Sequence, residues 1–395
     1  MRYRALTVLG GAVALAACST GSSGQSVQSA SSAAATASKS ESAPFPSTYK
    51  RYPGAPTALV GATVYDGKGG MIEGGTVLFA DGKVVGIGGS DLGIPAGYTR
   101  IDGTGKFVTP GIIDIHSHLG NYPSPSVQAH SDGNEATSPM TPQVWAEHSV
   151  WPQDPGFSRA MANGGITSLQ ILPGSANLMG GRSATLKNVP SRTVQGMKFP
   201  DAPYGFKMAC GENPKRVYGG RGRMPSTRMG NFAVNRQMWL DAKVYANGDR
   251  KKRDLAKETL AGVLDGDILV HNHCYRADEM ALVMDMAKEA GYRVSTFHHA
   301  VEAYKIGDLL KENEVCSAIW ADWYGFKMEA YDTIEENIPF VHAQGACAMI
   351  HSDDHFIKKR IGIFFRRNRD GLHIYVQALE MKVFYNAHHR TSADL

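Results

Sequence analysis

Cysteine is scarce in this chain, and its spacing excludes one class of metal site. The 395 residues include five cysteines, and no two of them are separated by only two residues. A zinc site built from Cys-x-x-Cys pairs is therefore excluded. The spacing of Cys210, Cys274, Cys316 and Cys347 demands no disulfide either, so we expect these four to be buried free thiols.

An excess of charge of either sign is also missing. Lys and Arg number 41 and Asp and Glu number 37, which gives a formal net charge of +4. Nucleic-acid binding usually needs a stronger or more clustered basic excess, so we expect no nucleic-acid partner. The composition is 43% hydrophobic and 20% charged, which is ordinary for a globular protein and sufficient for a large core.

The first apolar run is too short to cross a membrane as an ordinary helix. It covers residues 6–17, follows Arg2 and Arg4, and ends in the sequence LAAC at Cys18. This arrangement resembles a bacterial lipoprotein signal peptide over residues 1–17, with Cys18 as the lipidated residue; the alternative is a plain secretory signal. We therefore expect an exported protein that is lipid-anchored on the periplasmic side of a bacterial membrane, in our interpretation the outer membrane. Residues 18–50 are rich in Ser and Ala and predict a flexible tether.

The rest of the chain changes pattern near residue 109. Residues 58–108 alternate short β-rich runs with glycines and predict short antiparallel strands, with a hairpin turn at Asp81–Gly82. From Gly111 onward, strand-like and helix-like segments alternate, which indicates parallel β/α units. We expect eight strands, near 111–116, 165–171, 184–188, 204–209, 267–271, 292–298, 315–320 and 346–352.

Histidines and an aspartate follow several of these strand-like runs. The first run ends in His116-Ser117-His118, and residues two apart on a strand point to the same side, as two ligands of one divalent metal must. The alternative is two surface histidines in a loop. Later runs end in His271 and His273, in His298 and His299, and in Asp353. This repetition predicts that the chemistry lies at the carboxyl edge of a parallel sheet or barrel.

These motifs together resemble a known family. The segments TPGIIDIHSHLG, HNH, HHA and SDD are similar to those of the metal-dependent amidohydrolase superfamily, and the imidazolonepropionase-like branch looks nearest. The resemblance runs from about Ala58 to Asp354. It implies an α/β fold with a (β/α)8 TIM-type barrel over residues 109–354 and part of a small β-sandwich over residues 58–108. It also implies one or two divalent metals, zinc in our expectation, that activate a water to hydrolyse C–N bonds.

The resemblance also assigns roles to individual residues. It implies that the metal ligands are His116, His118, His271 and His299, with Asp353 rather than Asp354 as the general base. A bridging ligand between two metals would be Glu212, which we favour, or a carboxylated Lys207. We expect His298 to face away from the site, because neighbours on a strand alternate sides. Asp114 is either a hydrogen-bond acceptor beneath the metal ligands or a capped strand charge.

The expected substrate is a small amide or a peptide-like molecule. His273, Arg216, Arg228 and Tyr324 follow predicted strands and are candidates for binding it. The arginines could hold a substrate carboxylate in a bidentate pair, although a solvated basic loop is the alternative. Trp320, Trp323 and Phe326 are equally suited to the core and to a pocket wall.

Residues 355–395 do not fit the rest of the pattern. They carry eight Lys or Arg against three Asp or Glu and contain no proline. We interpret them as an aberrant basic tail produced by a frameshift or premature stop, in preference to a tail that binds anionic lipid. This leaves two alternatives to an active amidohydrolase, namely a truncated, catalytically impaired metal-binding remnant and a deaminase on the same scaffold.

Overall fold

The computed structural model describes residues 44–67, 69–320, 323, 325–351 and 353, and the backbone of strands 361–368 and 371–378. The expected signal peptide with Cys18, the tether up to residue 43, Tyr324, Asp354 and the remainder of the tail lie outside the described residues. Predictions that concern them therefore stay predictions.

Residues 57–108 form one five-stranded sheet. Its strands are β1 (Thr57–Tyr65), β2 (Met71–Ala80), β3 (Lys83–Gly88), β4 (Thr99–Asp102) and β5 (Phe107–Val108). The order is β3-β2-β1-β4, with β5 also paired to β1. The first three strands are antiparallel as predicted, whereas β4 and β5 run parallel to β1.

The predicted hairpin turn joins β2 to β3. Ala80 pairs with Lys83, and the two residues between them, Asp81 and Gly82, have φ angles of 51° and 67°. Two consecutive positive φ angles are what a two-residue hairpin turn of this kind requires, and Asp-Gly tolerates them well.

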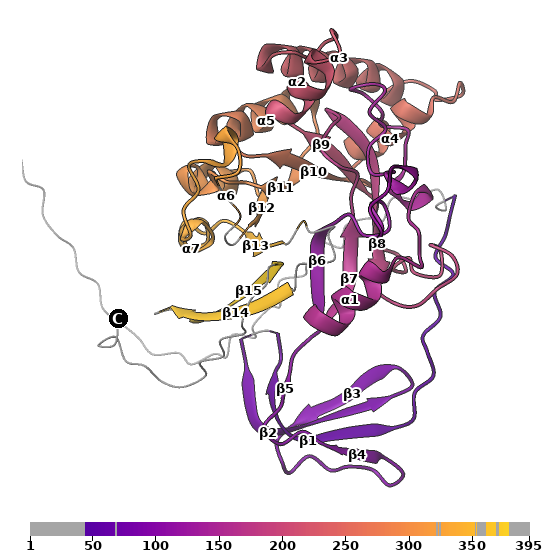
Figure 1. Cartoon of the computed structure of the whole chain (residues 1–395), viewed down its shortest axis with the longest axis vertical. Coiled ribbons are helices and arrows are strands. Elements are labelled where there is room, and N and C mark those ends of the chain that lie inside the picture. Colours follow the sequence, from indigo (N-terminus) through magenta and orange to yellow (C-terminus); the bar gives the residue numbers. More distant parts are fainter. Residues whose placement is uncertain are drawn as a thin grey trace, which may run out of the picture. The chain divides into compact units, whose positions relative to one another are not determined.

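A second sheet contains eight strands and curls as Figure 1 shows. The strands are β6 (Ile112–Ser117), β7 (Ile166–Ile171), β8 (Met179–Lys187), β9 (Gly205–Ala209), β10 (Leu269–Cys274), β11 (Val294–His299), β12 (Cys316–Ile319) and β13 (Ala348–Ile350). They follow one another in sequence order, and all eight overlap the predicted positions. Within the described residues β6 and β13 are edge strands, so the sheet is an open half-barrel rather than the closed barrel we expected.

The third strand departs from the predicted parallel pattern. β8 runs antiparallel to both β7 and β9, while the other neighbours in this sheet are parallel. The cause is the short connection between Ile171 and Met179. A parallel neighbour needs a crossover of a dozen or more residues, and this loop is too short to supply one.

Helices connect most of the parallel strands. They are α1 (Pro155–Gly164), α2 (Glu212–Gly219), α3 (Arg228–Ala246), α4 (Leu255–Leu264), α5 (Ala277–Ala290), α6 (Gly307–Glu312) and α7 (Asn337–Ala343), with 3-10 turns at Gln128–His130, Ala146–His148, Ala303–Lys305 and Met328–Ala330. The sequence explains the ends of α1, because Asp154 caps its first turn, Pro155 opens it and Gly165 with a φ of 62° ends it. The main core between helices and sheet contains Phe206, Trp239 and Met280. No helix in the described part of the chain is long and apolar enough to span a membrane.

Two disulfides replace the free thiols that we expected. Cys210 is bonded to Cys274 and Cys316 to Cys347. Each pair joins neighbouring strands of the curled sheet, which brings the Cα atoms to 5.2 Å and 4.5 Å. The partners are 64 and 31 residues apart in sequence, so the pairing depends on strand order and could not be read from the spacing.

The described end of the predicted tether is held against the folded chain. The Phe45 ring packs edge-on against Trp145 at 5.5 Å, and Thr48 N–H donates to the carbonyl of Gln195 at 3.0 Å. Ser47 donates to the carbonyl of Lys198 at 2.7 Å. Residues 44–50 are therefore not part of a free linker, because the aromatic Phe45 supplies apolar surface that the Ser/Ala-rich stretch lacks.

The described part of the tail is a hairpin. β14 (Ile361–Asn368) and β15 (Gly371–Ala378) pair antiparallel with each other, with Asn368 opposite Gly371. This backbone pairing does not test the frameshift interpretation.

Candidate active site

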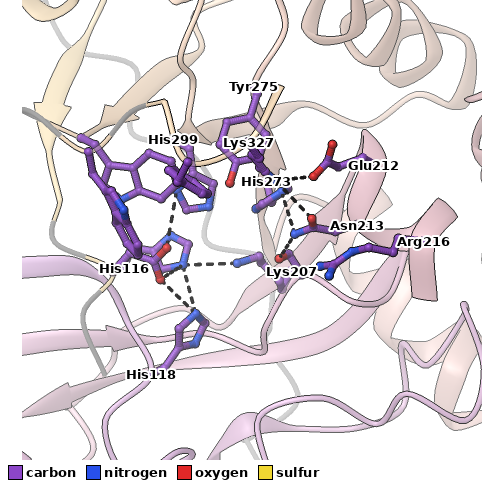
Figure 2. Close-up of a pocket in the computed structure, with 15 residues that line it drawn as sticks. His116, His118, Lys207, Glu212, Asn213, Arg216, His273, Tyr275, His299 and Lys327 are labelled. Atoms are coloured by element: carbon purple, nitrogen blue, oxygen red, sulfur yellow. Dashed lines mark hydrogen bonds and ion pairs between the residues drawn. The ribbon is translucent and has the colours of Figure 1, made fainter. Parts of the chain in front are cut away.

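A cavity of about 380 Å³ opens at the carboxyl ends of several strands of the curled sheet. Its lining comes from β6, β9, β10 and β11, from the start of α2, and from the segments that follow β7, β12 and β13. Figure 2 shows His116 and His118 on one side of this pocket and Glu212, Asn213 and Arg216 on the other. The lining residues are His116, His118, Ser175, Lys207, Glu212, Asn213, Arg216, His273, Tyr275, His299, Trp320, Trp323, Phe326, Lys327 and Asp353.

His116, His118 and Asp353 converge on one point of the pocket. The Nε2 atoms of the two histidines lie 3.3 Å apart, and Asp353 Oδ1 is 3.3 Å from the first and 3.2 Å from the second. His118 Nδ1 lies 2.8 Å from the carbonyl of Leu172, so it carries the proton and leaves Nε2 as the ligand atom. One possible ligand atom from each of the three residues lies within 4.8 Å of the other two, so a single metal ion could bind all three.

The protonation of these groups suits a divalent metal. Burial, with the nearby charges of Lys207 and His298, holds the pKa of His116 well below its usual range, so the imidazole is neutral. Burial opposes ionisation of Asp353, but the hydrogen bond and charge of His118 outweigh it and lower the pKa of that carboxyl. Neutral imidazole and ionised carboxylate are zinc donors, so the residues present fit such an ion.

His351 belongs to this cluster, and the sequence analysis missed it. It is buried, its ring stacks on His116 with centroids 4.8 Å apart, and neither of its ring nitrogens has a hydrogen-bond partner in the described structure. Together with His116 and His299 it forms a second group of possible metal donors. The signal was present, since His351 and Asp353 repeat the spacing of His116 and His118.

His299 lies in the pocket as expected, and its backbone explains why. It has a φ of 70°, followed by 42° at Ala300, so the strand twists out of its regular alternation. Its ring stacks on Trp320 at 4.0 Å, and Nδ1 is 3.8 Å from Asp353 Oδ2. The twist lets His299 and its neighbour His298 both face inward.

His298 and His271 correct two expectations. His298 does not face away, since its Nδ1 lies 2.8 Å from His116 Nδ1 and the residue is fully buried. His271 is partly buried beneath the pocket, with its Nδ1 2.9 Å from His298 Nε2. It is therefore one residue removed from the cluster of His116, His118 and Asp353 that it was expected to join.

Lys207 and Glu212 lie in different surroundings. Lys207 is almost fully buried on β9, and its Nζ is 3.5 Å from His116 Nε2. Burial lowers its pKa to about 8. The Glu212 side chain is instead 31% exposed, 3.5 Å from Lys327 Nζ. Contrary to the preference for Glu212, the structure places Lys207 against the histidine cluster.

The remaining predicted residues are divided between the pocket and its support. His273 and Arg216 line the pocket, with His273 Nε2 3.4 Å from Asn213 Nδ2. Arg228 is absent from the described lining, since it pairs with Glu279 at 2.8 Å and also with Glu329. Asp114 Oδ1 accepts the backbone N–H of His116 at 3.1 Å, a contact that fits both alternatives given for this residue.

Similarity to known proteins covers most of the described chain. No family model matches it. The crystal structure of an amidohydrolase from Thermotoga maritima is 36% identical with a TM-score of 0.70, covering 76% of this chain and 79% of that one. An amidohydrolase, tasK, from Hapsidospora irregularis is 31% identical over 314 residues, which are 72% of this chain and 31% of the fungal protein. An imidazolonepropionase from Stenotrophomonas maltophilia is 47% identical over 57 residues, 14% of each chain.

The length of the match differs between these relatives. The chain spans about a third of the fungal protein and 14% of the imidazolonepropionase, but more than three quarters of the Thermotoga structure. The Thermotoga structure combines an identity above 30% with a similar fold over most of both chains. The chain belongs to the amidohydrolase superfamily.

Proposed function

We propose that the protein is a hydrolase that uses a bound divalent metal, zinc in our proposal, to cleave carbon–nitrogen bonds in small amide or peptide-like molecules. The convergence of neutral His116, of His118 and of ionised Asp353 at the pocket carries this proposal. His299 and His351 would supply further nitrogen donors for one or two ions. A metal held there would act as a Lewis acid that lowers the pKa of water and polarises a carbonyl.

Asp353 is the group that we assign to proton transfer. Its lowered pKa keeps the carboxylate ionised near neutral pH, so it can accept a proton from a water beside it. The same oxygen can then deliver that proton to the departing amine. Its contacts with His116 and His118 hold the carboxylate in place for both steps.

We further propose a substrate with a carboxylate and an apolar group, and the far side of the pocket supports this. Arg216 and Lys327 bring positive charge to the lining, and Lys327 is 3.1 Å from Asn213 Oδ1. Trp320, Trp323 and Phe326 form an aromatic wall. We propose N-acyl-amino acids or dipeptides as the first substrates to test, because their carboxylate matches the basic side chains. The imidazolonepropionase stretch adds cyclic amides to the panel.

The test combines metal analysis with turnover. The purified protein is expected to contain zinc and to hydrolyse at least one compound from panels of N-acyl-amino acids, dipeptides and cyclic amides. If Arg216 binds the substrate carboxylate, analogues of the active compound in which a carboxamide replaces that carboxylate should react more slowly. Metal without turnover would support the remnant alternative, and release of ammonia would indicate a deaminase.

A further inference from the structure

We infer that His298 and His271 are positioning residues that hold the metal ligand His116 in one tautomer through a chain of hydrogen-bonded imidazoles. The inference rests on the proposed function, since it concerns the metal that function requires. The chain runs from the pocket inward, with 2.8 Å between the Nδ1 atoms of His116 and His298 and 2.9 Å between His298 Nε2 and His271 Nδ1.

The donor and acceptor in each of these hydrogen bonds follow from His116, the ring that faces the pocket. His116 Nε2 faces His118, Asp353 and Lys207, so it is the nitrogen that would hold a metal. An imidazole that binds metal through Nε2 carries its proton on Nδ1 and donates it to a partner. His116 Nδ1–H therefore donates to His298 Nδ1, which must be unprotonated.

The same argument fixes the next two rings. His298 with an unprotonated Nδ1 is protonated on Nε2, and it donates that proton to His271 Nδ1. His271 then carries its own proton on Nε2, and it is only partly buried. Each contact has one donor and one acceptor, so metal binding at His116 selects a single arrangement of all three rings.

The burial of His298 makes this role specific. The residue is fully buried, and each of its two ring nitrogens lies within hydrogen-bond distance of another histidine, His116 or His271. A buried polar ring is costly unless it is hydrogen-bonded, so the two contacts stabilise it where it is. Partners that orient a metal-binding histidine typically contribute 10- to 100-fold to metal affinity.

Two substitutions of His298 separate hydrogen bonding from packing. His298→Leu keeps a similar volume but removes the acceptor, whereas His298→Asn places an amide oxygen near the Nδ1 position. We expect zinc affinity, measured by chelator competition on the full chain, to fall about 10- to 100-fold in the leucine variant. The asparagine variant should recover part of that loss, and cobalt-loaded protein should show a changed visible spectrum only in the leucine variant.

Controls keep the test decisive if a variant folds poorly. Thr296→Val changes a buried residue on the same strand and should bind zinc like the wild type. His271→Leu acts one ring further away and should lose less affinity than His298→Leu. Nitrogen-15 NMR of the zinc-loaded wild type should show protons on His116 Nδ1 and His298 Nε2, which a purely structural role would not dictate.

Three results would overturn the inference: wild-type affinity in His298→Leu, equal losses in the leucine and asparagine variants, or a proton on His298 Nδ1. A wild type that binds no divalent metal would defeat both the proposed function and this inference. A wild type that binds zinc but hydrolyses none of the panel would defeat the proposed function alone, because metal affinity is measured without turnover.

Discussion

At the scale of single residues, chemistry in this site depends on which groups stay neutral and which stay charged. Burial keeps the pKa of His116 well below its usual range, and Asp353 stays ionised beside it. The sequence identified both residues from their places after strands. The spacing of His351 and Asp353 repeats that of His116 and His118, but it does not show that His351 contacts His116, because that contact joins β6 to the segment after β13.

Asp353→Asn tests the proposed proton transfer. Asparagine keeps the shape and one oxygen but cannot accept a proton, so kcat should fall by roughly 10²- to 10⁴-fold. The measurement is turnover of the substrate found in the panel, normalised to metal content. Asp308→Asn changes an exposed carboxylate on α6 and should have no effect. Equal activity of the two variants would remove Asp353 from the mechanism.

Lys207 and Glu212 give a second residue-scale prediction. Glu212→Gln should leave metal content nearly unchanged, because the carboxylate lies beside Lys327 and is partly exposed. Lys207→Met keeps the buried volume but removes the amine next to His116, so it should change metal affinity by about tenfold or more. Titration with zinc under chelator competition measures both. Metal loss in Glu212→Gln alone would restore Glu212 as the bridging ligand.

At the scale of elements, the two disulfides join neighbouring strands at different ends. The disulfide Cys210–Cys274 joins β9 to β10 beside Lys207 and His273, at the carboxyl ends of both strands. Cys316–Cys347 joins β12 to β13 near their amino ends instead. One bond therefore joins strands at their carboxyl ends, where the pocket lies, and the other joins strands at their amino ends.

The paired variants Cys210→Ala/Cys274→Ala and Cys316→Ala/Cys347→Ala separate stability from site geometry. Each should lower the free energy of unfolding by about 2 to 5 kcal/mol, as measured by urea denaturation. Only the first pair lies beside the pocket, so only it should also weaken zinc binding. Equal zinc affinity in the two variants would show that the first bond does not support the site.

At the scale of the whole molecule, two histidines with lowered pKa values couple folding to pH. Burial, with the charge of Lys207, lowers the pKa of His271 to about 4, and burial lowers that of His351 to about 3 despite the opposing charge of Asp353. In the unfolded chain both return to about 6.5. The unfolded state therefore binds more protons between these values, and stability is lost as pH falls below about 6.5.

Metal-free protein should show this loss directly. After treatment with a chelator, the free energy of unfolding in urea should be nearly constant from pH 8 to pH 7. It should decrease steadily from pH 6.5 toward pH 4, because the two histidines take up protons on unfolding. Stability that rises as pH is lowered over this range would contradict the neutral state of these rings in the folded protein.

The predicted anchor concerns residues outside the described structure. We propose that lipid on Cys18 attaches the protein to a membrane, so Cys18→Ala should move it to the soluble fraction after cell lysis. The domain itself should remain intact, because the Ser/Ala-rich composition of residues 19–43 predicts a tether outside it. Membrane association that survives the substitution would argue against the anchor and point to the basic tail.

The sequence by itself determined what depends on local patterning. The Asp81–Gly82 hairpin, the positions of eight strands and the placing of His116, His118 and Asp353 at strand ends all follow from periodicity and turn chemistry. These features are local because each one rests on a few adjacent residues.

Only the tertiary structure decided what depends on contacts between distant segments. The direction of β8 followed from the short loop before it, the disulfides from strand order, and the inward position of His298 from the twist at His299. The same holds for Lys207, which reached His116 because β9 and β6 curve around one pocket. Contacts of this kind join residues tens to hundreds of positions apart, and their geometry exists only once the sheet has assembled.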